Sequence, residues 1–170
     1  PWEAVIAGLY DMPAYTIGLH NATQGIADGL RMIAGKHNLD LVIGVDRLDY
    51  SKGIPHRIRA FRELLANYPE NRDSATLIQI VSPSREAVDA YADIRRELEG
   101  LCVAINCDYG ELDWMPVRYI HRTVARKRLP GLYRAARVGV ITPLRDGMNL
   151  VAKEFVVAQD PADPGVLVLS

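Results

Sequence analysis

The sequence has 170 residues, of which 49% are hydrophobic and 24% are charged, as expected for one globular domain. Its net charge of −1 leaves no overall field that would attract nucleic acid or an anionic membrane surface. No apolar run reaches the roughly 20 residues that span a bilayer. With two cysteines, too few for a disulfide framework, we expect a cytoplasmic protein with reduced thiols.

Residues 1–38 show no clear hydrophobic period, because glycines recur through them. We interpret them as a linker or partial segment from a domain junction, with a helix over residues 23–34. The first residue is Pro1, and Ser170 ends the sequence within an apolar run. We therefore expect residues 39–170 to form one domain that is truncated at its C-terminal end.

From residue 39 onward, short apolar runs alternate with helical patterns. In chain order the sequence predicts a strand over 41–45, a helix over 55–68, a strand over 76–81, a helix over 84–99, a strand over 117–121, a helix over 130–136, a strand over 138–141, a helix over 149–159 and a strand over 166–169. This alternation predicts an α/β fold, a doubly wound parallel sheet with helices on both faces. Ligands bind such sheets at the carboxyl ends of the strands.

The loop after the first predicted strand reads Asp46-Arg47-Leu48-Asp49-Tyr50-Ser51-Lys52-Gly53. Arg47 offers a planar fork to phosphate oxygens, and Lys52 offers a mobile point charge. Gly53 allows a tight turn into the next helix. The alternative is a solvated loop in which the two cations pair with Asp46 and Asp49.

The loop after the fourth predicted strand carries a longer motif, Thr142-Pro143-Leu144-Arg145-Asp146-Gly147-Met148-Asn149-Leu150-Val151-Ala152-Lys153-Glu154-Phe155. Free N–H groups at the start of its helix favour a diphosphate. Glu154 falls within the apolar face that Leu150, Val151, Phe155 and Ala158 are expected to form, so it needs a partner or a ligand. Asp146 and Glu154 suit the hydroxyls of a sugar and a ribose, and the alternative for Glu154 is an ion pair with a neighbouring arginine.

Other polar groups give weaker signals. Arg85 follows the second strand and is placed to meet an anion at the same edge, although an exposed arginine at a helix start is the alternative. The basic run over residues 118–128 lacks interleaved stacking aromatics, which favours a solvated loop over a nucleic-acid track. No set of histidines has ligand spacing, and Cys102 with Cys107 is weak evidence for zinc, so the sequence requires no metal.

Residues 45–53 and 142–154 resemble the two signatures of the C-terminal domain of the trehalose-6-phosphate synthase family, and the likeness runs from about residue 39 to the end. The resemblance implies the donor-binding half of a two-domain (GT-B) retaining glycosyltransferase. It implies transfer of glucose from UDP-glucose to glucose 6-phosphate, giving trehalose 6-phosphate and UDP. UDP-glucose is then a substrate, and no cofactor is implied. An N-terminal domain with most acceptor contacts would be missing, so we expect the isolated chain to be inactive.

The resemblance also implies roles for individual residues, with Arg47, Lys52 and Asp146 as the catalytic ones. By this resemblance Arg47 and Lys52 would contact the UDP diphosphate, and Asp146 the glucose hydroxyls. The backbone of Gly147, Met148 and Asn149 would lie against the sugar and the phosphates. Leu150 would lie near the nucleotide, Glu154 would bind the ribose, and Arg85 would reach the acceptor phosphate. Two alternatives stay open: a non-catalytic sugar-nucleotide-binding module, and a related transferase with another acceptor such as glycerol phosphate.

Overall fold

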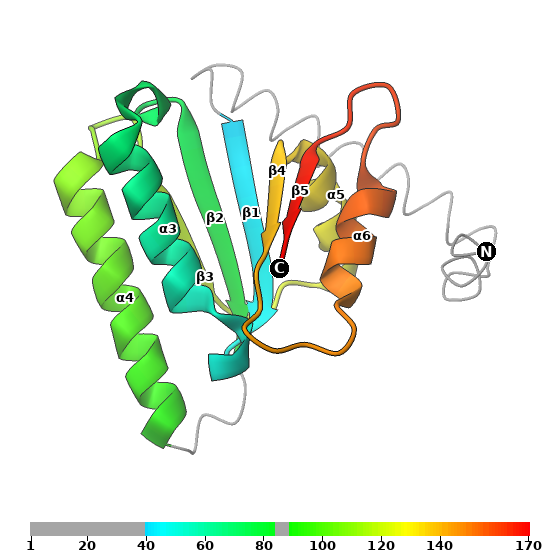
Figure 1. Ribbon diagram of the computed structural model, residues 1–170, viewed down its shortest axis with the longest axis horizontal. Helices are drawn as coiled ribbons and strands as arrows, with labels where there is room; N and C mark the ends of the chain where they lie inside the picture. The colour runs from blue at the N-terminus through cyan, green and yellow to red at the C-terminus, as the bar shows by residue number, and fades with distance from the viewer. Residues whose placement is uncertain (1–39, 84–88) are drawn as a thin grey trace.

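A five-stranded, entirely parallel sheet forms the centre of the computed structural model, which describes residues 40–83 and 89–170 (Figure 1). The strands lie in the order β3-β2-β1-β4-β5. Their bounds are Asp40–Arg47 for β1, Ala75–Ser82 for β2, Val117–His121 for β3, Val138–Ile141 for β4 and Val166–Leu169 for β5. The doubly wound parallel sheet expected from the sequence is confirmed. The interpretation of residues 1–38, and Arg85, fall outside the described residues.

The direction of strand addition reverses between β1 and β4. Strands β1, β2 and β3 follow one another towards one edge, and β4 and β5 continue on the other side of β1. Strand β1 pairs with β2 through eight residue pairs, from Asp40↔Ala75 to Arg47↔Ser82. It pairs with β4 only at Val42↔Val138 and Ile43↔Gly139. The carboxyl ends of β1 and β4 therefore have no ladder bonds between them, which is the switch point where such sheets bind ligands.

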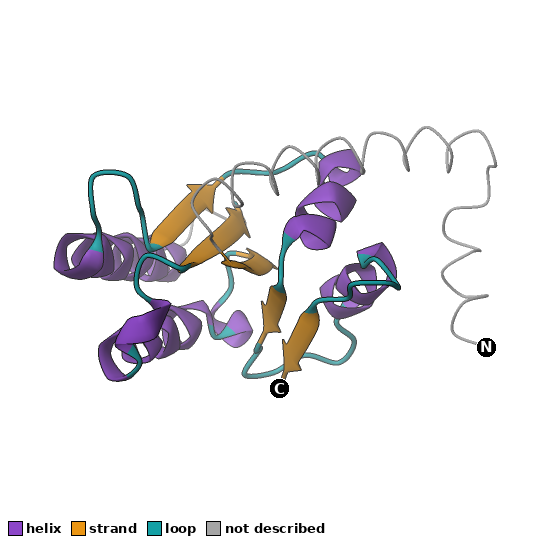
Figure 2. Ribbon diagram, turned by 90° about the horizontal axis from the view of Figure 1, so that it is seen from above, coloured by secondary structure: helices purple, strands orange, loops and turns teal. Residues whose placement is uncertain are grey.

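Two pairs of helices cover the two faces of the sheet (Figures 1 and 2). Helices α3 (Ile54–Asn67) and α4 (Asp89–Tyr109) lie on one face, and α5 (Leu129–Ala135) and α6 (Leu150–Ala158) lie on the other. Short 3₁₀ turns are η1 (Tyr50–Lys52), η2 (Pro69–Asn71) and η3 (Arg126–Arg128). Right-handed crossovers between parallel strands produce this distribution of helices.

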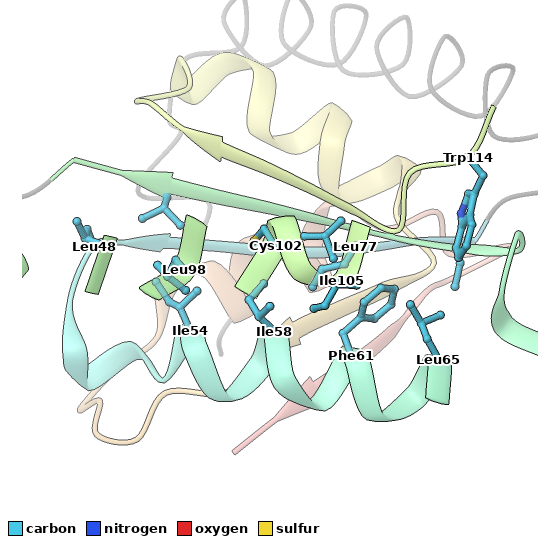
Figure 3. Packing of buried hydrophobic residues seen from close by; sticks show 13 residues of the cluster. Leu48, Ile54, Ile58, Phe61, Leu65, Leu77, Leu98, Cys102, Ile105 and Trp114 are labelled. Carbon is cyan, nitrogen blue, oxygen red and sulfur yellow. The ribbon is translucent and has the colours of Figure 1, made fainter. Parts of the chain in front are cut away.

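Each face has its own hydrophobic cluster. On the α3–α4 face, a row of α3 side chains points towards the sheet and towards α4 (Figure 3); the row is Ile54, Ile58, Phe61 and Leu65. These positions repeat at three and four residues, the period of a helix with one buried stripe. On the other face, Tyr133 of α5 and Phe155 of α6 meet edge to face, with ring centroids 6.3 Å apart.

Helix α4 is longer than the sequence predicted. The expected end at Glu99 is wrong, because the helix continues through Gly100 to Tyr109. The buried residues Leu98, Cys102 and Ile105 extend the helical spacing past the glycine, so packing against the core outweighs the low helix propensity of one residue. None of the described helices is long and apolar enough to cross a membrane.

Two glycines provide a matched test of this packing. A Cβ at Gly139 of β4 would lie 2.8 Å from the buried ring of Phe155, whereas a Cβ at Gly100 of α4 would meet nothing within 4 Å. We expect Gly139→Ala to lower the free energy of unfolding by about 1–3 kcal/mol through overpacking. Gly100→Ala should raise it by roughly 0.5–1 kcal/mol, because alanine loses less backbone entropy in a helix. Urea unfolding of both variants measures the difference, and equal stabilities would contradict the α6–β4 packing.

Candidate functional site

The loop after β1 folds back on itself and then enters α3. Asp49 caps η1, because its Oδ1 accepts a hydrogen bond of 2.8 Å from the backbone N–H of Ser51. Gly53 then adopts φ 62°, in the left-handed region that favours glycine. A Cβ there would lie 2.7 Å from the carbonyl oxygen of Thr142. The predicted role of Gly53 in a tight turn is confirmed, and the same glycine lets the loops after β1 and β4 approach each other.

The loops after β1 and β4 meet through backbone and side-chain contacts. The carbonyl oxygen of Ser51 accepts hydrogen bonds from the N–H groups of Leu144, at 2.7 Å, and Arg145, at 3.1 Å. The Nζ of Lys52 lies 2.6 Å from Oδ2 of Asp146, and the exposed fractions of the two side chains are 15% and 20%. Two residues that are 94 positions apart in the sequence therefore form one charged pair at the switch point.

Asp146 is held by several donors at the start of α6. Its Oδ2 also accepts a hydrogen bond of 3.0 Å from Nδ2 of Asn149, and the Oδ1 of Asn149 caps the helix by accepting from the N–H of Ala152 at 3.1 Å. The pKa of Asp146 lies below its usual 3.8, mainly because of the hydrogen bond from Lys52. The positive charge of Lys52 and the hydrogen bond from Asn149 lower this pKa further. The carboxylate is thus kept ionised and oriented.

Arg47 is exposed, and its side chain makes no hydrogen bond or ion pair with any residue in 40–83 or 89–170. Burial of the nearby Asp49 carboxyl would raise its pKa, but the hydrogen bonds from Ser51 and the charges of Arg47 and Lys52 lower it overall. The alternative of a loop neutralised by Asp46 and Asp49 is therefore only partly realised. Asp49 caps the turn, and Arg47 remains available to an anion.

Glu154 has the partner that its position in α6 demands. Its Oε1 lies 3.4 Å from Nη2 of Arg126, and its side chain is 24% exposed. This is the arginine pairing that the sequence left as an alternative. The apolar face differs from the predicted one, because Leu150 at the start of the helix is 50% exposed and Ala152 is buried in its place.

The other residues of the second motif lie in the loop before α6. Gly147 and Met148 are exposed, and Gly147 has open space around its Cα. Within the described ranges, no three His, Cys, Asp or Glu side chains gather where they could hold a metal ion. The arrangement combines cations with oriented carboxylates at one edge of the sheet. Such an edge can bind a phosphate group and a polyhydroxylated group side by side.

A buried polar network beneath the loops was missed by sequence reasoning. Arg57 of α3 donates from Nη1 to Oδ2 of Asp46, at 2.5 Å, and to Oε1 of Gln79, at 3.0 Å. Its Nε donates to Oγ1 of Thr142 at 3.2 Å. A signal was present, since Arg57 lies three residues after Ile54 and four before Phe61, on the apolar face of α3.

Comparisons with known proteins agree in family. Residues 20–170 match the model of glycosyltransferase family 20. A trehalose-6-phosphate synthase of Salmonella paratyphi B is 53% identical over 133 residues, which cover 78% of this chain and 28% of the relative. The chain therefore spans less than a third of the length of that relative.

Two solved structures have the same fold. An α,α-trehalose-phosphate synthase (UDP-forming) from Burkholderia xenovorans in complex with glucose-6-phosphate is 48% identical with a TM-score of 0.79, over 86% of this chain and 34% of the other. A structure described as trehalose-6-phosphate from E. coli bound with UDP-2-fluoro glucose is 45% identical with a TM-score of 0.80, over the same shares.

The Lys52–Asp146 pair can be tested by titration. A depressed pKa means that the contribution of the pair to stability is present above the unfolded pKa of Asp146 and is lost as the pH falls through the folded pKa. In Lys52→Met we expect the pKa of Asp146 to rise towards 3.8, because the main donor is gone. Carboxyl NMR across an acid titration measures this shift. The control Arg62→Met removes a cation that pairs with Asp108 instead. If the pKa of Asp146 rose equally in this control, Lys52 would not be the cause of its depression.

Proposed function

The chain belongs to glycosyltransferase family 20, and we propose that it binds UDP-glucose as the donor half of a trehalose-6-phosphate synthase. One observation carries the proposal: the two motifs meet across the switch point, where Lys52 and Asp146 lie 2.6 Å apart. Because the chain spans 28% of the length of the Salmonella relative, the acceptor and the transfer itself are part of the proposal. The acceptor is glucose 6-phosphate, and the reaction needs no cofactor.

The first loop binds the diphosphate of the donor. Arg47 is exposed and uncommitted among the described residues, and a guanidinium matches phosphate oxygens with two parallel hydrogen bonds. Lys52 is already held by Asp146, so its ammonium is positioned before the ligand arrives. A preorganised charge of this kind needs little rearrangement when the ligand binds. Lys52 contacts the diphosphate with its remaining N–H donors while Asp146 keeps one.

The second loop and α6 bind the sugar and the nucleoside. Asp146 accepts hydrogen bonds from the glucose hydroxyls, and the backbone of Gly147, Met148 and Asn149 lies against the sugar and the phosphates at the start of the helix. Leu150 is exposed and lies near the nucleotide. Glu154 binds the ribose hydroxyls, with Arg126 as its partner in the unliganded chain. Arg85, outside the described residues, reaches the acceptor phosphate.

The transfer proceeds with retention at the anomeric carbon. The bond between C1 of glucose and the β-phosphate oxygen of UDP breaks, and a bond from C1 to an acceptor hydroxyl oxygen forms on the same face. The hydroxyl proton passes to the departing phosphate oxygen. Negative charge grows on that oxygen in the transition state, and Arg47 and Lys52 stabilise it. Catalysis by this half is therefore electrostatic, with no nucleophilic side chain.

Donor binding is tested first by calorimetric titration of the chain with UDP and UDP-glucose. We expect both ligands to bind, and the double variant Arg47→Ala, Lys52→Ala to weaken binding by at least about 100-fold, since charged hydrogen bonds contribute about 1.5–3 kcal/mol each. The control Arg62→Ala, Arg96→Ala removes the same charge from α3 and α4 and should bind like the wild type. A folded chain that binds neither ligand would contradict the proposal.

Transfer is tested in a chimera in which this chain replaces the matching region of the Salmonella relative. With UDP-glucose and glucose 6-phosphate we expect trehalose 6-phosphate, identified by mass. Arg47→Ala in the chimera should lower kcat by about 10²–10³-fold, the usual cost of one preorganised donor to developing charge. A product formed only from glycerol phosphate would assign another acceptor, and a near-normal rate with Arg47→Ala would contradict the role of this residue.

A further inference from the structure

The carboxyl ends of β1 and β4 are not joined by the sheet. Beyond the pair Ile43↔Gly139 the two strands share no ladder bonds, and the last residues of β1 pair only with β2. The candidate binding groups begin with Arg47, the last residue of β1, and continue on the loops that follow β1 and β4 and into α6. Contacts outside the sheet ladder must therefore set the distance between the two loops, and the backbone bonds to Ser51 are some of them.

Arg57 of α3 bridges the gap between the carboxyl ends of β1 and β4. Its guanidinium is buried, with 2% of the side chain exposed, and it contacts both strand ends at once. Nη1 donates to Asp46, the residue before Arg47, at 2.5 Å, and Nε donates to Thr142, the first residue after β4, at 3.2 Å. Resting on the proposed function, we propose that Arg57 is a positioning residue that fixes the spacing of the two donor-binding loops through Asp46 and Thr142.

The arrangement suits arginine alone among the cationic side chains. The guanidinium presents its donors as a rigid planar fork, so an acceptor on β1 and an acceptor directly after β4 are held at a fixed separation, which a single ammonium does not do. Gln79 completes the network by accepting from Nη1 at 3.0 Å and donating from Nε2 to Asp46 at 3.3 Å. A Cβ at Gly44 would lie 2.7 Å from Nη1, so β1 carries a glycine where the guanidinium passes.

Stability by itself gives a poor reason to retain this network. A buried ion pair is often no more stabilising than apolar residues of the same volume, because both charges lose their hydration. Nη2 of Arg57 is buried and has no hydrogen-bond partner among the described residues, which adds a further cost. The gain lies in geometry, since the network holds Asp46 near the end of β1 and Thr142 directly after β4 without touching Lys52 or Asp146.

The test uses Thr142→Val, which keeps the shape of the side chain and removes only the acceptor for Nε. We expect UDP-glucose affinity in calorimetric titration to fall by about threefold to tenfold, the range of one hydrogen bond. Thr142→Ser restores the hydroxyl and should bind like the wild type. The matched control is Thr76→Val, since Thr76 Oγ1 accepts a bond of the same 3.2 Å from Trp114 at the far end of the sheet. It should lower the melting temperature and leave affinity unchanged.

Hydrogen exchange separates this inference from the proposed function. The N–H groups of Leu144 and Arg145 bond to Ser51 across the gap, so Thr142→Val should accelerate their exchange in the ligand-free chain, and Thr76→Val should not. Unchanged exchange at both amides, or equal losses of affinity in the two valine variants, would overturn the positioning role. If the wild-type chain does not bind UDP-glucose, but Thr142→Val still accelerates exchange at these two amides, the proposed function is refuted. The positioning role of Arg57 between the two loops is then retained.

Discussion

The early separation of β1 and β4 is the constraint on which the arrangement of the site depends. Two residue pairs join these strands, compared with eight between β1 and β2, so the sheet opens at its carboxyl edge. The open edge is what allows a ligand to reach the strand ends. It also removes the ladder bonds that would otherwise hold the loops, and their place is taken by the Arg57 network, the bonds to Ser51 and the Lys52–Asp146 pair.

The fold could be predicted from the sequence because its elements are short and strongly patterned. The strands over residues 117–121, 138–141 and 166–169 were expected with the bounds they have, since each is short, rich in β-branched, aromatic or other apolar residues and flanked by a polar residue, a glycine or a proline. The helix expected to end at Glu99, directly before Gly100, instead continues to Tyr109 as α4. Whether one glycine ends a helix depends on the core contacts that follow it, and Cys102 and Ile105 supply contacts that local propensity does not include.

The site could be predicted as two motifs but not as one arrangement. Position after a strand placed Arg47, Lys52 and Asp146 at the same edge, yet no local pattern says which charges pair. The Lys52–Asp146 bond joins residues 94 apart, and Asp46 pairs with Arg57 rather than with the loop cations. The sequence showed Arg57 only as a charged residue among the apolar positions of α3, without indicating its partners. Long-range partners depend on strand order, which follows from the whole chain.

The buried ion pair of Asp46 and Arg57 also constrains the length of the chain between them. Asp46 and Arg57 are 11 positions apart, and the segment between them contains a 3₁₀ turn, the left-handed Gly53 and the first turn of the helix. An α-helix turns by about 100° per residue, so one inserted or deleted residue before Arg57 would carry its guanidinium off the buried face. The segment is therefore constrained in length as well as in sequence, where Gly53 already admits no side chain without strain.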